Sequence, residues 1–323
     1  GGSCRPCSDC SDGVQSGSET GVDCGGDCAS CASVYQFKKV VSGTTSALKK
    51  VDCFGSNCAA IGEGGLILIS LDKGVTWNAV SSGSSNELFG VDVYENTIFI
   101  TGENGLIKKS TDLGQSFTDI VIRNRDKVQW NGVLFFNNDT GIVCGSKLSI
   151  SFTNDGGVTW KSSKYSFDSQ RSFYGFSAPA KNALYAVGDN NIQLSSDFGE
   201  NWNQISLSND NPDIKNLTDV YYASSTRAFI TGESSMLFSN NSIEWYDKAL
   251  YTSFGGLSFG TNNGLYAGRD VENERGKILE TLDSGVTWRQ IPLLNESVRF
   301  NDCFIIDESN SIIIGEGGTI LRR

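Results

Sequence analysis

The chain of 323 residues contains no histidine, a single methionine and four prolines. Without histidine, Ser-His-Asp and Cys-His nucleophilic catalysis and every histidine-based metal site are excluded. No apolar run approaches the roughly 20 residues that a membrane-spanning helix needs. Basic residues are scarce, with 26 Lys and Arg against 37 Asp and Glu and a net charge of −11. This balance argues against a nucleic-acid partner, which needs clustered Lys and Arg, and against adhesion to anionic lipid.

What the chain does have is one short phrase, repeated at near-constant spacing. Each copy reads Ser or Thr, any residue, Asp, any residue, Gly, any residue, a small or polar residue, and then an aromatic residue. The aspartates of the five full copies are Asp72, Asp112, Asp155, Asp197 and Asp283. The aromatic residues that close these copies and one decayed copy are Trp77, Phe117, Trp160, Trp202, Trp245 and Trp288. Successive aromatics are 40 to 43 residues apart, a period that predicts stacked propeller blades.

Between successive phrases the chain reads as short strands. The runs are rich in β-branched and aromatic residues, and Gly, Asn and Asp turns separate them. The pattern starts near residues 48, 89, 128, 172, 217, 254 and 300, which gives seven units. The seventh lacks its fourth strand, and residues 37–40 match the missing pattern. We therefore predict an all-β, seven-bladed β-propeller in which the N-terminal strand pairs beside residues 319–322 and closes the ring.

The repeated phrase resembles the Asp-box, or BNR, repeat of sialidase-type propellers. The blade pattern is similar to that of the seven-bladed propellers of the photosystem II assembly-factor family, over about residues 35–323. This resemblance implies the fold and no single function, because Asp boxes occur in hydrolases, receptors and assembly factors alike. We interpret the box aspartates as structural: each carboxylate should accept backbone N–H bonds within its own turn, and each Trp should bury its ring between blades. Asp155→Ala should then destabilise the fold and spare ligand binding.

Residues 1–33 form a different kind of segment, with six cysteines among Ser, Gly and Asp and almost no large apolar side chain. These cysteines are Cys4, Cys7, Cys10, Cys24, Cys28 and Cys31. Such a segment cannot bury a core and needs covalent staples. Three disulfides are favoured, with fifteen pairings open, and four thiolates around zinc are the alternative. The stretch 10–28 resembles a small cysteine-rich module of secreted and surface proteins of microbes. We divide the chain into this module, residues 1–33, and the propeller, residues 34–323.

The propeller contains four further cysteines. Cys53 and Cys58 flank a hairpin turn and should face each other within disulfide reach. Cys144 and Cys303 occupy apolar strand positions and are expected to be buried free thiols. Disulfides indicate an oxidising, extracellular setting, and no signal peptide opens the chain, so residue 1 is expected to be a processed terminus. Four Asn-x-Ser/Thr sequons in predicted turns are then candidate glycosylation sites: Asn138, Asn216, Asn240 and Asn295.

Two classes of function fit the sequence. A pair of Asp or Glu residues on the propeller face would suffice for glycoside hydrolysis, so a carbohydrate-active hydrolase is the alternative. The longer loops of one rim instead suit contact with a protein or a glycan, at Tyr165, Phe167, Arg269 and Arg275. We expect a non-catalytic extracellular interaction or structural glycoprotein without cofactor or metal. Its partner would be a protein, a glycan or other copies of itself, as in a surface filament or coat that the N-terminal module helps to assemble.

Overall fold

The computed structural model describes residues 37–125, 127–163, 171–180, 183–189, 191–205, 216–223, 227–233, 236–240, 245–247, 250, 252–272, 274–293 and 297–323. The chain divides into two compact units, residues 1–38 with Arg323 and residues 39–322. The six cysteines of the predicted N-terminal module lie outside the described residues, so their pairing stays a prediction. In the described part, no helix is long and apolar enough to cross a membrane.

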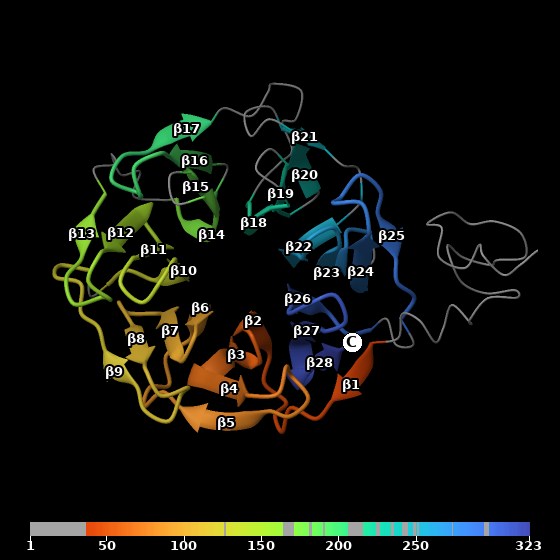
Figure 1. Cartoon of the computed structure of the whole chain (residues 1–323), viewed down its shortest axis with the longest axis horizontal. Helices are drawn as coiled ribbons and strands as arrows, with labels where there is room; N and C mark the ends of the chain where they lie inside the picture. The colour runs from red at the N-terminus through yellow and green to blue at the C-terminus, as the bar shows by residue number, and fades with distance from the viewer. Residues whose placement is uncertain are drawn as a thin grey trace, which may run out of the picture. The chain divides into compact units, whose positions relative to one another are not determined.

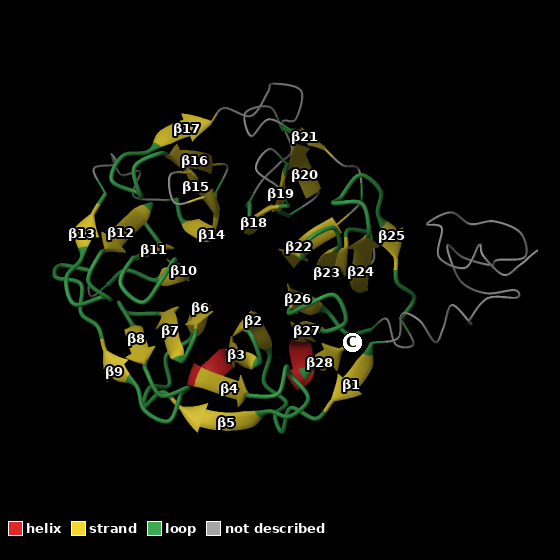
Figure 2. Cartoon of the chain, in the orientation of Figure 1, coloured by secondary structure: helices red, strands yellow, loops and turns green. Residues whose placement is uncertain are grey.

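The described strands form seven four-stranded sheets arranged as blades in a ring (Figure 1). Helical structure in the described residues is confined to two short 3-10 turns, η1 (Glu63–Gly65) and η2 (Glu316–Gly318) (Figure 2). The predicted seven-bladed β-propeller is therefore confirmed. Blades 1 to 3 contain β2 (Leu48–Phe54), β3 (Asn57–Gly62), β4 (Leu66–Ser70), β5 (Asn78–Ser81), β6 (Leu88–Tyr94), β7 (Thr97–Gly102), β8 (Ile107–Ser110), β9 (Thr118–Asp119), β10 (Trp130–Phe135), β11 (Gly141–Gly145), β12 (Ser149–Thr153) and β13 (Lys161–Ser162).

The remaining four blades follow the same order. Blades 4 to 6 contain β14 (Phe173–Ala180), β15 (Ala183–Gly188), β16 (Asn191–Ser195), β17 (Asn203–Ile205), β18 (Asp219–Tyr222), β19 (Ala228–Thr231), β20 (Met236–Ser239), β21 (Tyr246–Asp247), β22 (Thr252–Phe259), β23 (Gly264–Asp270), β24 (Gly276–Thr281) and β25 (Arg289–Gln290). Blade 7 contains β26 (Phe300–Ile305), β27 (Ser311–Gly315), β28 (Ile320–Arg322) and β1 (Lys38–Val40), in the sheet order β1-β28-β27-β26. The first strand of the chain therefore completes the last blade, as the sequence predicted.

The loops lie on two rims, and backbone hydrogen bonds define which loops share a rim. The box turn of a blade bonds to the hairpin between its first two strands, as Lys73 N–H does to the Ser56 carbonyl at 3.0 Å. The loop between the second and third strands bonds instead to the segment entering the blade, as Glu316 N–H does to the Arg299 carbonyl at 3.0 Å. The long loops of blade 6 therefore belong to the rim opposite the Asp boxes.

Side chains packed between neighbouring blades form the core. Trp77 is buried in one cluster with Ile312 and Ile314 of blade 7, and Trp202 lies in another with Ile142 of blade 3. Trp245, from the decayed repeat, is buried in the same way between blades 4 and 5. Each of these three Trp rings packs its own blade against the preceding one, whereas the rings of Phe117, Trp160 and Trp288 are only partly buried.

The Asp boxes are hydrogen-bonded turns at the surface. Each box carboxylate accepts the backbone N–H four residues later, as Asp155 Oδ1 does from Thr159 at 2.8 Å. The predicted bond within the turn is therefore present, but Asp155 itself is exposed. The buried donor of the turn is the Gly157 N–H, and it is satisfied by the Thr153 hydroxyl at 3.0 Å. The same pair of bonds occurs in all five boxes, with distances of 2.8–3.0 Å for the Gly N–H and 2.8–2.9 Å for the Asp bond.

The four propeller cysteines lie as predicted. Cys53 and Cys58 are directly opposed in the β2–β3 ladder and form a disulfide, with their Cα atoms 4.1 Å apart. Cys144 and Cys303 are buried free thiols in blades 3 and 7. A directly opposed antiparallel pair brings two Cβ atoms within bonding distance, so the β2–β3 hairpin itself positions this bond.

Candidate functional site: the central pocket

The first strands of the seven blades surround a cavity of about 320 Å³ at the centre of the propeller. The ladders of β2, β6, β10, β14, β22 and β26 each carry a register shift near their start. Aligned on that shift, and on Asp219 at the corresponding place in β18, the first position reads Lys50, Gly90, Gly132, Gly175, Asp219, Gly256 and Asp302 around the ring. Four glycines leave room at the centre, and three charged side chains extend into it.

The glycines are required because neighbouring first strands approach closely. A Cβ at Gly90 would lie 2.4 Å from Thr101 Oγ1 and 3.1 Å from the Gly132 Cα. A Cβ at Gly256 would lie 1.8 Å from Asp302 Oδ1. These positions therefore bring the backbones together and leave the cavity to the charged side chains of the other blades.

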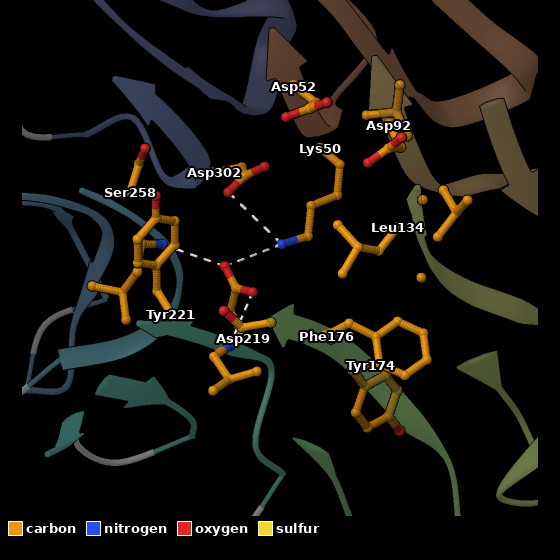
Figure 3. A pocket seen from close by; sticks show the side chains of 18 of the residues that line it. Lys50, Asp52, Asp92, Leu134, Tyr174, Phe176, Asp219, Tyr221, Ser258 and Asp302 are labelled. Carbon is orange, nitrogen blue, oxygen red and sulfur yellow. Dashed lines mark hydrogen bonds and ion pairs between the residues drawn. The ribbon is translucent and has the colours of Figure 1, made fainter. Parts of the chain in front are cut away.

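Lys50 lies at the middle of the pocket between two aspartates from other blades (Figure 3). Its Nζ is 3.4 Å from Asp219 Oδ2 and 3.7 Å from Asp302 Oδ1. The side chains of Lys50, Asp219 and Asp302 are 28%, 15% and 6% exposed, so the network is largely withdrawn from water. Asp52 lies two residues after Lys50 in β2, and Asp92 lies two residues after Gly90 in β6. They add two more carboxyl groups to the pocket, from blades 1 and 2.

The carboxylates also connect the blades. Asp52 Oδ2 accepts the Val93 N–H of blade 2 at 2.6 Å, and Asp219 Oδ2 accepts the Leu257 N–H of blade 6 at 3.3 Å. The carboxylate of Asp302 likewise bonds to the backbone of blade 1. Polar neighbours continue the pattern, since Ser258 Oγ accepts the Ile305 N–H at 2.9 Å. The inner strands are thus joined by side-chain bonds that replace the missing ladder between blades.

Burial has the largest influence on the pKa values of these charged groups. It raises the pKa of Asp52 to about 7 and that of Asp302 to about 6, although backbone N–H groups and the Lys50 ammonium oppose the shift. Burial raises the pKa of Asp92 well above its usual range, and the nearby Asp52 charge adds to this. Burial lowers the pKa of Lys50, but the charges of Asp219 and Asp302 outweigh it and leave the pKa raised. Lys50 is therefore a fixed cation, while Asp52, Asp92 and Asp302 keep their protons to a higher pH than an ordinary aspartate.

The residues singled out in the sequence lie elsewhere. None of the five box aspartates lines the pocket. Tyr165, Phe167 and Asn295 lie outside the described residues. The described sequon residues Asn138, Asn216 and Asn240 are exposed and outside the strands, as a glycan would require, and their occupancy stays a prediction.

Arg269 belongs to a charged patch on the rim opposite the boxes, the blade 6 rim patch, formed by Phe254, Arg269, Glu274, Arg299 and Glu316. Arg299 contacts Glu274 at 2.5 Å, and Arg269 contacts Glu316 at 3.6 Å. The Arg269 guanidinium lies 5.9 Å from the centre of the Phe254 ring, which is 36% exposed. Arg275 lies in the loop of the same β23–β24 hairpin, where its carbonyl accepts the Asp270 N–H at 2.8 Å.

Sequence reasoning missed the pocket. Lys50, Asp52, Asp92, Asp219 and Asp302 each look like an ordinary polar residue at the start of a strand. The signal becomes visible only when the seven first strands are aligned, because one position is then either glycine or a charged residue in every blade. In the described residues, no three His, Cys, Asp or Glu side chains are placed to hold one metal ion.

Comparisons with known proteins agree with this architecture. A sequence model of the family described as photosynthesis system II assembly factor YCF48 matches residues 125–216. No match was found among curated protein sequences. The solved structure of YCF48 bound to D1 peptide is 17% identical over 90% of this chain and 95% of that chain, with a TM-score of 0.73. The chain is a seven-bladed propeller built from BNR-type repeats.

Two further structures show how widely this propeller is shared. YCF48 from Cyanidioschyzon merolae is 17% identical over 88% of this chain and 98% of that chain, with a TM-score of 0.70. A GH74 enzyme from Niastella koreensis also has a TM-score of 0.70, at 13% identity, but the match spans only 53% of that enzyme. At these identities the likeness shows the fold alone.

Proposed function

We propose that this protein is a non-catalytic extracellular glycoprotein whose propeller binds a protein partner. The observation that carries the non-catalytic role is the use of the pocket carboxylates. Asp52, Asp219 and Asp302 each accept a backbone N–H from the next blade, and Asp302 and Asp219 also neutralise Lys50. Carboxylates engaged in this way hold the ring together and are poorly placed to serve as a free acid and nucleophile.

The protein partner is supported by the rim and by the comparisons. The blade 6 rim patch combines a partly exposed aromatic ring with arginines and glutamates, a composition that suits protein contacts. A similar propeller, YCF48, is known in complex with D1 peptide. Because this chain is acidic, we expect its partner to differ from the D1 peptide. Other copies of the same protein are also expected as partners, through the N-terminal module.

The extracellular setting is supported by chemistry within the blade. The Cys53–Cys58 disulfide requires oxidising conditions to persist, as do the three disulfides predicted for residues 1–33. Fractionation of the source cells, with mass spectrometry of peptides containing Asn138, Asn216 and Asn240, tests both location and glycosylation. Recovery in a reducing cytosolic fraction with unmodified asparagines would refute this part.

Binding is tested by cross-linking the protein in its source material, purifying it and mapping the linked peptides by mass spectrometry. The cross-links should cluster on the blade 6 rim patch, and Arg269→Ala should weaken partner binding, while Lys161→Ala on the exposed outer strand β13 should leave it unchanged. In parallel, deleting residues 1–33 should reduce assembly size. Cross-links confined to the box rim, with Arg269→Ala silent, would contradict the partner site.

A hydrolase is the second candidate, because Asp302 and Asp52 have pKa values of about 6 and 7, in the range of a catalytic acid. The fold is also similar to that of GH74 enzymes. A glycan array followed by a turnover assay separates the two functions. Turnover that Asp302→Asn abolishes in the folded protein would replace the binding role with the catalytic one.

A further inference from the structure

The central pocket is lined by more carboxyl groups than cations. Its lining residues include four aspartates, Asp52, Asp92, Asp219 and Asp302, and one cation, Lys50. Lys50 is committed to Asp219 and Asp302, at 3.4 and 3.7 Å. Among the residues that the structure describes, no other Lys or Arg lines the pocket. Among the described residues, Asp52 and Asp92 form no ion pair with a cation, so they are a second acidic site, and ionising its buried carboxyl groups is costly unless a cation enters the pocket.

Asp92 carries an unused acceptor at this site. The residue is only 7% exposed, and its Oδ2 has no hydrogen-bond partner among the described residues. Figure 3 shows its carboxyl group directed toward the pocket, beside Leu134 and the stem of Lys50. Because buried carboxyl oxygens are normally bonded, an orphan acceptor facing a cavity indicates a donor that completes the site.

The rest of the lining limits what that donor is. Tyr174, Phe176 and Tyr221 supply aromatic rings, and Leu134 and Leu257 supply apolar walls. The volume of about 320 Å³ is large enough for a small organic cation. Aromatic rings around carboxylates favour a cation that is apolar along its stem and charged at its tip. A bare metal ion would instead require several convergent ligands, and no three His, Cys, Asp or Glu side chains of the described residues are placed to hold one.

We propose that the central pocket binds an alkylammonium group, which donates to Asp92 and Asp52 while its carbon chain packs against Leu134 and the aromatic rings. The group comes either from a free small amine or from a lysine side chain of a bound polypeptide. In both cases the ammonium is the counter-charge that the second acidic site lacks. The proposal goes beyond the partner binding proposed above and does not require the blade 6 rim patch.

Calorimetric titration of the full chain with n-butylamine tests the ammonium itself, with 1-butanol as the neutral probe of equal length. Saturable binding of butylamine at one site, without binding of butanol, is expected. Putrescine and a capped peptide with one central lysine distinguish the two sources. Binding of the free amines alone assigns a small-molecule site, and binding of the peptide assigns a polypeptide. Binding of neither amine nor peptide would overturn the proposal.

Asp92→Asn is the decisive variant, because the amide keeps the shape and one acceptor oxygen and removes the charge. It should weaken butylamine binding at least tenfold. Asp139→Asn, on an exposed turn of blade 3, removes the same net charge outside the pocket and should have no effect. Equal loss in both variants, or binding of Ca²⁺ or Mg²⁺ that displaces the amine, would overturn the ammonium assignment. Circular dichroism checks that each variant is folded. Failure of the rim cross-linking experiment would leave these titrations unaffected, so the two proposals fail separately.

Discussion

The carboxylate of Asp302 accepts the backbone N–H of Val51 at 2.9 Å, across 251 residues of sequence. Asp302 lies on the first strand of the last blade and Val51 on the first strand of the first blade, so this bond closes the inner ring as β1 closes the outer one. The other oxygen of Asp302 lies 3.7 Å from Lys50, the residue just before Val51. The Asp302 side chain thus holds the backbone of blade 1 at Val51 and also pairs with the charge of Lys50 in the same blade.

Asp302→Ala is expected to destabilise the propeller by at least about 1–3 kcal/mol, because it leaves the buried Val51 N–H without an acceptor and removes one partner of Lys50. Asp302→Asn should cost less, since the amide oxygen still accepts from Val51. Urea unfolding followed by tryptophan fluorescence gives both values. Glu308→Ala, at an exposed position of the same blade, serves as the control and should stay within about 0.5 kcal/mol of the parent. An Asp302→Ala value equal to this control would contradict the role.

The box hydroxyl should matter more to stability than the box carboxylate. Thr153→Val removes the acceptor of the buried Gly157 N–H and is expected to cost about 1–3 kcal/mol. Asp155→Ala breaks a bond to an exposed N–H that water can replace, so it should lower the melting temperature by less. Differential scanning calorimetry of the two variants ranks them. The reverse order would restore the carboxylate as the main support of the turn.

Stability is expected to be highest near pH 4, below neutrality. The box turns hold the pKa of Asp112 and Asp155 at about 2 through hydrogen bonds from Ser116 and Thr159, so their contribution is present above the unfolded value of about 3.9 and is lost as the pH falls toward 2. Burial raises the pKa of Asp52 to about 7 and that of Asp302 to about 6. The folded state therefore holds protons that the unfolded chain releases, and stability falls as the pH rises from about 4 to 7.

Urea midpoints measured from pH 2 to 8 should trace this maximum. Asp52→Asn should flatten the limb between pH 4 and 7, whereas Asp139→Asn should leave it unchanged. A maximum at pH 7 or above in the parent protein would show that the pocket acids are ionised at little cost.

The buried thiols should be unreactive until the protein unfolds. Burial raises the pKa of Cys144 and Cys303 well above the usual thiol range, and both are at most 2% exposed. Alkylation of the native protein, followed by peptide mass mapping, should leave both cysteines unlabelled. Both should be labelled in denaturant, while Cys53 and Cys58 appear only after reduction. A peptide linking Cys144 to Cys303 would contradict the placement of these thiols in separate blades.

The fold could be predicted from the sequence because each blade repeats the same short sequence pattern. The aromatic spacing from Trp77 to Trp288, and the match of the N-terminal strand to the incomplete last blade, fix blade number and closure without any long-range contact being known. The Cys53–Cys58 pair followed in the same way from the register of one hairpin. Such features depend on local pattern, which a single sequence displays.

The pocket was not accessible, because it depends on which side chains meet across the ring. Lys50 and Asp219 are 169 residues apart and lie on blades 1 and 5, so no local pattern relates them. The box turns misled in a smaller way: Asp155 is the prominent residue in the phrase, yet burial assigns the inner hydrogen bond to Thr153. Distinguishing these roles requires exposure, which repeats alone do not give.

Removing the closing strand provides a direct test of the ring. Deleting residues 34–42 while retaining residues 1–33 removes β1 and exposes β28 as an unpaired edge, since the sheet order places β1 outermost in blade 7. An exposed edge strand pairs readily with other chains, so the shortened protein should aggregate and melt at a lower temperature. Light scattering and thermal unfolding measure the two effects. Deleting residues 1–33 alone serves as the control, because it leaves β1 in place and should preserve the melting temperature of the propeller. A soluble protein of unchanged stability after loss of residues 34–42 would mean that three strands of blade 7 suffice to hold the ring closed.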